Sequence, residues 1–133
     1  MPERRNISTG TPWETRFGYS RVVVAGCMAF VSGTVAADHT GRIHATGDAA
    51  GQASYIYEEI GHALAQAGAS LRDVVRVRVY LTNIADIEAV GLVHHEVFAD
   101  VRPANRALAV AALAAPECLM EIEVDAMLRV ALS

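Results

Sequence analysis

Residues 103–127, PANRALAVAALAAPECLMEIEVDAM, decide the fold of this chain. They predict an apolar strand, a turn at residues 114–117, and a second strand that carries Glu121 and Glu123. Because side chains alternate between the two faces of a strand, both carboxylates should point the same way. Carboxylates between apolar flanks can mark a functional face. A half-exposed strand with one polar face is an equally good interpretation of the same pattern.

The stretch resembles the C-terminal signature of the YjgF/RidA family, the reactive intermediate deaminases. That signature has a Pro-Ala-Arg opening, a Val-x-x-Leu run, a Pro-Glu turn and a closing Val-Glu-Ile-Glu. Similarity extends over most of the chain, which is identified as a divergent member of the family. The matching segments are Pro103-Ala104, residues 110–113, Pro116-Glu117, residues 120–123, Tyr19, Ser32-Gly33, Gln52 and residues 67–82.

One departure concerns the arginine that members of the family use in catalysis. Its position falls on Asn105, and Arg106 takes the next one. A shift of one residue in a strand sends a side chain to the opposite face, so Arg106 should point away from a cleft that contains Asn105. A bulge that loops out Asn105 would instead turn Arg106 inward. Both arrangements remain open at this point.

The resemblance implies a cleft lined by Tyr19, Ser32, Asn105, the backbone of Ala107, and Glu121. In intact family members the arginine grips the carboxylate of a 2-imino acid, and the glutamate positions a water that attacks the C=N carbon. Ammonia leaves and a keto acid remains. An Asn in place of the arginine removes a charge-assisted contact that contributes about 1.5 to 3 kcal/mol or more.

Two further side chains are candidates for substrate binding. Glu14 lies beside Trp13 in a segment rich in Gly and Pro, and His94 lies near the end of a predicted helix. Surface packing for Trp13-Glu14 and a solvated or interface histidine are the simpler interpretations. His94 and the adjacent His95 cannot bind one ion from the same helical face. We therefore expect neither a metal nor an organic cofactor.

The order of elements predicts a single α+β domain over residues 1–133. We expect a short strand and a loop before residue 18, a hairpin around Gly26, a helix after Asp48, a strand near 74–81, a helix near 84–98, and two closing strands. Two helices should then cover one face of a mixed sheet. Ala107, Ala109 and Ala111 would form an apolar strand face suited to a second copy. The resemblance implies a chorismate-mutase-like sandwich, a trimeric barrel, and clefts between subunits.

Charge and composition narrow the partners and the compartment. The formal net charge is −4 and the chain has no Lys, which argues against nucleic acid. Cys27 and Cys118 are expected to be buried free thiols in a reducing compartment. Neither a signal-like start nor an apolar run of bilayer length is present in the sequence, so we expect a cytoplasmic protein without membrane contact.

Two functions fit these observations. The first is a hydrolase of the Rid type that deaminates a small imine or enamine, with Glu121 positioning the water. The second is a trimer that binds a small metabolite without chemistry. We favour the enzyme because a pure binding role does not require Glu121.

Overall fold

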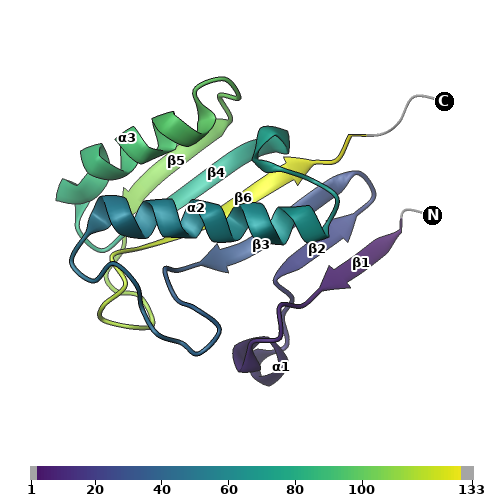
Figure 1. Cartoon of the computed structure of the whole chain (residues 1–133), viewed down its shortest axis with the longest axis horizontal. Helices are drawn as coiled ribbons and strands as arrows, with labels where there is room; N and C mark the ends of the chain where they lie inside the picture. The colour runs from purple at the N-terminus through teal and green to yellow at the C-terminus, as the bar shows by residue number, and fades with distance from the viewer. Residues whose placement is uncertain (1–2, 130–133) are drawn as a thin grey trace.

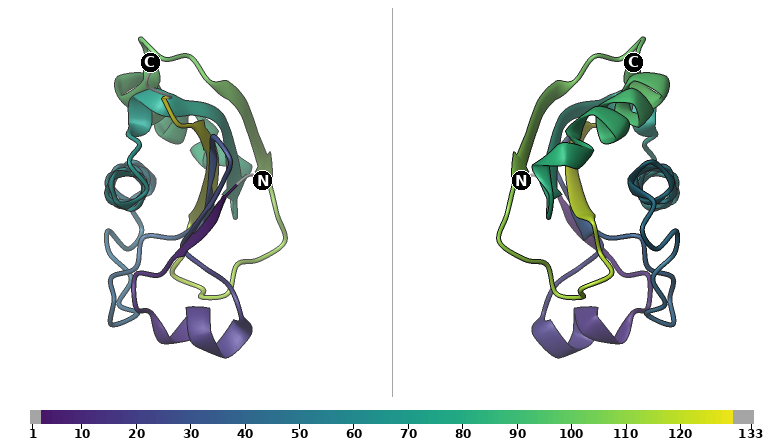
Figure 2. Two further views of the ribbon diagram at one scale, coloured as in Figure 1. Left: turned by 90° about the vertical axis from the view of Figure 1, so that its right-hand side faces the viewer. Right: turned by 90° about the vertical axis from the view of Figure 1, so that its left-hand side faces the viewer.

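The computed structural model describes residues 3–129 of the chain. Six strands form one sheet, and helices α2 (Ala49–Gln66) and α3 (Ile87–Phe98) lie on the same face of it (Figure 1). Figure 2 shows the sheet edge-on, with both helices on one side. The predicted α+β sandwich is thereby confirmed.

The sheet is mixed, as predicted. Its order is β1-β2-β3-β6-β4-β5. Every pairing is antiparallel except that of β4 with β5. The last strand along the chain, β6, therefore lies between β3 and β4. The strands are β1 Arg4–Ile7, β2 Val22–Ala25, β3 Met28–Thr34, β4 Val74–Leu81, β5 Ala104–Ala109 and β6 Met120–Met127.

Helix α2 begins where the sequence predicts. The side chain of Asp48 accepts a hydrogen bond from the backbone N–H of Gly51, which caps the helix N-terminus. At the other end, Gly68 has φ +83°, a left-handed conformation that Gly adopts without steric cost. The buried stripe packs on the sheet and includes Ile56, Tyr57, Ile60 and Leu64.

Helix α3 is shorter than predicted. Residues Ile84–Asp86 form a separate 3-10 turn, because the side chain of Asn83 accepts from the N–H of Ala85 and fixes that turn. A second 3-10 turn, Leu71–Asp73, leads from α2 into β4. Within α3, the side chains of Val90, Val93 and Phe98 are buried, whereas that of Ile87 is exposed.

A short helix, α1, occupies residues Pro12–Phe17, where the sequence analysis predicted a loop. Pro12 stands in its first turn, and Gly18 ends it with φ 76°. Six residues are too few to show helical periodicity, so only these two end signals mark the helix.

Strand β6 supplies the centre of the core. Met120, Ile122, Val124 and Ala126 have no exposed surface and face the helices. Glu121, which alternates with them, points to the other face and is half-buried. The predicted hairpin of β2 and β3 also forms, and Cys27 in its turn is exposed rather than buried, because turn residues have no neighbouring strand above them. Cys118 is buried as expected.

Candidate functional site

The register of β5 settles the positions of Asn105 and Arg106. Pairing with β4 is continuous from Ala104 to Ala109, so the alternative in which Asn105 is looped out is wrong. Asn105 lies opposite Val77, a fully buried residue, and shares its helix-covered face. Arg106 lies opposite Arg78 and therefore points to the open face of the sheet.

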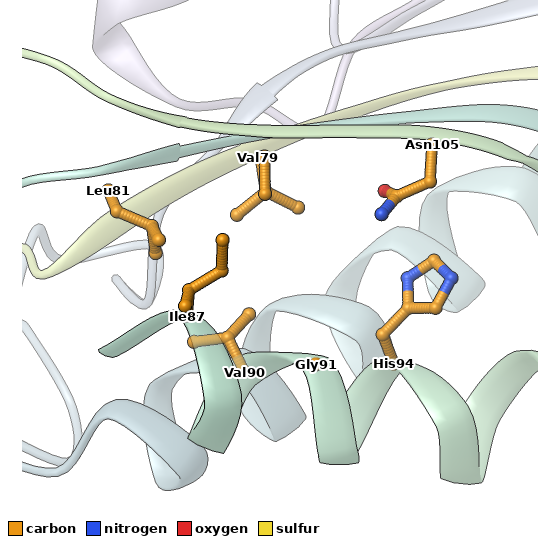
Figure 3. Close-up of a pocket in the computed structure, with 8 residues that line it drawn as sticks. Val79, Leu81, Ile87, Val90, Gly91, His94 and Asn105 are labelled. Atoms are coloured by element: carbon orange, nitrogen blue, oxygen red, sulfur yellow. The ribbon is translucent and has the colours of Figure 1, made fainter. Parts of the chain in front are cut away.

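Asn105, Ala107 and His94 line one cavity between β4, β5 and α3. Its volume is about 240 Å³, and Figure 3 shows the Asn105 amide and the His94 ring turned toward each other across it. The remaining lining is mainly apolar: Val79, Leu81, Ile87, Val90 and Gly91. Ala107 faces α3. The apolar strand face that we predicted as the contact with a second copy therefore does not lie on the open side of the sheet.

His94 is the titratable group of this cavity. Burial lowers its pKa, and the neighbouring His95 lowers it further. Its Nδ1 lies 3.2 Å from the hydroxyl of Tyr57, whose pKa burial raises. The ring is therefore uncharged at neutral pH, so the cavity offers neutral polar groups from His94 and Asn105.

Glu121 lies on the opposite face of the sheet. Burial raises the pKa of its carboxyl group, Glu123 adds to that rise, and Arg21 opposes it. Among the described residues, no side chain or backbone group hydrogen-bonds to this carboxylate. The residue that adjoins Glu121 on the neighbouring strand β3 is Gly33. A Cβ atom added to Gly33 would stand 2.8 Å from the carboxyl carbon of Glu121. Glu121 is thus a half-buried acid whose oxygens remain free for water or a ligand.

Arg21, which the sequence did not single out, lies near this carboxylate and opposes the rise in its pKa. Tyr19 lies beside Arg21, and Ser32 directly precedes Gly33, which adjoins the acid. Nη1 of Arg21 donates to the carbonyl oxygen of Gly33 at 3.0 Å and to Oγ1 of Thr34 at 3.3 Å. The guanidinium carbon lies 5.9 Å from the centre of the Tyr19 ring, which is 40% exposed. The hydroxyl of Ser32 donates to the carbonyl of Ser20 at 2.7 Å, so its oxygen is left to accept.

The two groups of residues do not meet within one chain. Asn105 pairs with Val77, whereas Glu121 pairs with Tyr80, three residues further along β4. That offset is about 10 Å along the strands, and the side chains lie on opposite faces. Asn105 and Glu121, which the resemblance assigns to one cleft, therefore do not share a face of a single chain. A cleft that uses both requires two copies of the chain.

Arg106 belongs to a polar network on the open face. Beside it, Nη1 of Arg78 lies 3.2 Å from a carboxylate oxygen of Asp125. The hydroxyl of Tyr80 donates a hydrogen bond to Glu123. This hydrogen bond raises the pKa of Tyr80, and the charge of Arg106 opposes the rise. Arg106 thus shares the face of Glu121 rather than pointing away from it, because Asn105 takes the helix-covered side.

The carboxyl group of Glu14 is engaged in contacts that hold the fold together. It is buried, and it accepts hydrogen bonds from the N–H and hydroxyl of Thr9 and from the hydroxyl of Thr11, at 2.7 to 3.2 Å. Burial alone would raise its pKa, but the hydrogen bonds from Thr11, Thr9 and Ser8 outweigh it and lower the pKa to about 2. Its oxygens hold the loop onto α1 and are not available to a ligand.

Between residues 3 and 129, no group of three or more His, Cys, Asp or Glu side chains could hold a metal ion. Within the same range, none of the helices has the length and hydropathy needed to cross a bilayer. The absence of a cofactor stays a prediction.

Comparisons with known proteins agree with the fold. The family model described as endoribonuclease L-PSP matches residues 11–128. The 3-aminoacrylate deaminase RutC of Acinetobacter baylyi is 34% identical over 122 residues, which cover 92% of this chain and 95% of that protein. The structure of Rv2704 from Mycobacterium tuberculosis, a member of the YjgF/YER057c/UK114 family, has a TM-score of 0.85 and 40% identity, covering 95% of this chain and 100% of that chain. RidA from an Antarctic Psychrobacter has a TM-score of 0.76 and 30% identity, covering 84% and 89%.

Proposed function

We propose that this chain, which belongs to the YjgF/RidA family, hydrolyses a small enamine or imine in a cleft between two copies of itself. The observation that carries the proposal is the carboxylate of Glu121. It is half-buried, its pKa is raised by burial and by Glu123, and no described group hydrogen-bonds to it. A free carboxyl group with a raised pKa suits a residue that both accepts and returns a proton.

The reaction needs one water and one proton shuttle. In its ionised form Glu121 orients a water and accepts its proton while the oxygen attacks the C=N carbon. The new C–O bond forms and the first proton passes to nitrogen, which gives an intermediate with a hydroxyl and an amino group on one carbon. Glu121 then transfers the hydroxyl proton to the amino group, and the C–N bond breaks as the C=O bond forms, so that ammonia and a carbonyl product are released. An enamine first takes a proton on carbon to become the imine, and the protonated form of Glu121 is a suitable donor.

The cleft would combine the two clusters from neighbouring copies of a homotrimer. One copy contributes Glu121, with Tyr19 and Ser32 as substrate contacts. Its neighbour contributes the cavity with Asn105, His94 and the backbone of Ala107. The separation of these clusters within one chain supports this arrangement, since the acid of one cluster and the cavity of the other can meet only across two copies. Cyclic assembly gives every copy one complete cleft.

The activity test uses iminobutanoate made freshly by an amino-acid oxidase, with ammonia release as the measure. Glu121→Gln should reduce turnover at least about a hundredfold, the effect typical of losing a general acid or base. Glu58→Gln, which removes an exposed carboxylate from α2, is the control, and its turnover should stay near that of the wild type. Equal turnover in Glu121→Gln and wild type would contradict the proposal.

A mixing experiment tests the shared cleft. Asn105→Phe fills the cavity, and Glu121→Gln removes the acid, so each variant alone should be inactive. When the two are unfolded and refolded together, random assembly gives about one intact cleft in four. Activity should reappear in the mixture. Continued inactivity of correctly assembled mixtures would show that both residues act within one copy.

A binding module without chemistry is the second candidate, and Asn105 favours it, because the position of the family's arginine carries no charge. In that case a small keto acid should bind saturably while no imine is hydrolysed. The same preparations decide between the candidates, because binding and turnover are measured separately.

A further inference from the structure

We propose that Arg21 binds the carboxylate of the substrate and so replaces the cationic anchor that Asn105 cannot provide. The inference rests on the proposed function and narrows its substrate class to small enamines or imines that carry a carboxylate. In this arrangement the anchor and the acid both come from one copy of the chain, and the neighbouring cavity receives the uncharged remainder of the substrate.

The position of Arg21 is fixed by the same glycine that adjoins the acid. Its Nη1 donates to the carbonyl oxygen of Gly33 at 3.0 Å, while the Cβ position of Gly33 lies 2.8 to 3.1 Å from the three carboxyl atoms of Glu121. A second bond, to Oγ1 of Thr34 at 3.3 Å, limits rotation of the guanidinium. The cation is therefore oriented beside Glu121 before any ligand arrives.

The guanidinium of Arg21 still has free hydrogen-bond donors. Both of its hydrogen bonds use Nη1, and among the described residues Nε and Nη2 donate to no protein group. These two nitrogens lie along one edge of the planar group and present parallel N–H donors. That geometry matches the two oxygens of a carboxylate. A purely structural strap would not require this free edge.

The surroundings of the guanidinium are also suited to a small anion. Its carbon lies 5.9 Å from the centre of the half-exposed Tyr19 ring, which forms a wall of the same site. Arg21 attracts the Glu121 carboxylate electrostatically but forms no ion pair with it within 4.0 Å in the described residues. A carboxylate held by Arg21 would thus place an adjacent C=N carbon near Glu121 without competing for its oxygens.

Neighbouring arginines have other partners. Arg78 pairs with Asp125 at 3.2 Å on the open face, and Arg5 donates to the carbonyl of Ala67. The charge of Arg106 opposes the rise in the pKa of Tyr80, and it does not contribute to the pKa shift of Glu121. Arg21 is the cation that the structure places against the candidate acid.

The test compares Arg21→Gln and Arg21→Lys with Arg72→Gln, a matched change of an exposed arginine in the 3-10 turn before β4. Calorimetry measures binding of 2-oxobutanoate, an anionic product analogue, and of butanone, its neutral counterpart. Ammonia release from iminobutanoate gives KM and kcat. Arg21→Gln should weaken 2-oxobutanoate binding and raise KM about ten- to a hundredfold, with butanone binding unchanged. Arg21→Lys keeps the charge without the fork and should fall between Arg21→Gln and wild type.

The outcomes separate this inference from the proposed function. Wild-type turnover with an unchanged KM in Arg21→Gln would overturn the inference and leave the proposed function standing. If the wild type does not hydrolyse the imine, the proposed function fails, and the binding arm alone decides. Loss of 2-oxobutanoate binding in Arg21→Gln then supports an anion anchor, and equal or absent binding overturns it. Should Arg21→Gln fail to fold, the same comparison is made with Arg21→Lys.

Discussion

The carboxyl group of Glu121 lies against the backbone of Gly33, so that a methyl group at position 33 would stand 2.8 Å from the carboxyl carbon and 2.9 Å from one oxygen. Side-chain carbons do not approach other heavy atoms this closely in folded proteins. A residue without a side chain is therefore a condition for the present position of the candidate acid. The same glycine accepts the hydrogen bond of Arg21 through its carbonyl.

Gly33→Ala should lower kcat at least about tenfold with little change in stability. The obstructing atoms are the far end of a flexible side chain, so the carboxyl group can rotate away at small cost, but it then leaves its catalytic position. Steady-state kinetics and thermal unfolding measure the two effects. Gly61→Ala is the control, because its Cβ would meet Leu71 at an ordinary 3.5 Å. A fully active Gly33→Ala variant would contradict the position assigned to Glu121.

Glu121→Gln should make the protein more stable than the wild type at pH 7. The folded-state pKa of Glu121 is raised by burial and by Glu123, so the folded state binds its proton more tightly than the unfolded state. Stability is then lost as pH rises through the folded pKa. Gln does not ionise, and the difference in Tm should vanish below about pH 4. Thermal unfolding from pH 4 to pH 8 checks this, and a Tm difference of the opposite sign at pH 7 would refute it.

Glu14→Gln should destabilise the protein at pH 7 and leave catalysis intact. The folded-state pKa is about 2, below the unfolded value. The ionised form therefore contributes stability above about pH 4.3, which is lost as pH falls toward 2. The shift corresponds to about 2 to 3 kcal/mol. Urea unfolding at pH 7 and pH 3 measures it, with the exposed Glu58→Gln as control. A raised KM with normal stability would instead assign Glu14 to the substrate.

Asn105→Arg should lower kcat/KM for iminobutanoate, because it places a cation in the mainly apolar cavity that receives the uncharged remainder of the substrate. An increase would instead place the carboxylate of the substrate in the cavity and not on Arg21. Arg106→Ala should leave kcat/KM unchanged, because Arg106, although it lies on the same face of the sheet as Glu121, does not contribute to the pKa shift of that acid. Ammonia release measures both variants. Inactivity of Arg106→Ala would show that Arg106 is the anchor.

The protein should be a homotrimer at micromolar concentration. The open sheet face carries half-buried charged residues, including the Arg78 and Asp125 pair, that a solvent-exposed face does not need. Light scattering should give about three times the chain mass of 14.2 kDa. A mass of one chain would exclude the shared cleft as well as the trimer.

Most of the fold could be predicted from strand alternation and helix caps in the sequence. The start of a helix after Asp48, the hairpin at Gly26 and the common face of Glu121 and Glu123 were all predicted, because each depends on local backbone preferences. Helix α1 was missed because it is held by hydrogen bonds from loop residues to Glu14, which no periodic pattern records.

The site was predicted less completely, for a geometric reason. Alternation correctly separated Asn105 from Arg106, but it does not say which of the two faces the helices. Arg21 could not be selected because its contacts with Gly33 and Thr34 join residues that are distant in sequence, which strand alternation does not record. A Tyr-Ser-Arg segment before a strand was the only local signal.

The central place of β6 has a consequence for synthesis on the ribosome. β6 is the last strand to be made, yet it pairs with both β3 and β4. Until it emerges, the hairpin of β2 and β3 and the parallel pair of β4 and β5 have no common ladder, and two strand edges stay unpaired. Such edges are templates for association with other chains. The nascent protein therefore depends on its final strand to close the sheet, and protection of those edges by a chaperone would be needed most during the delay before β6 arrives.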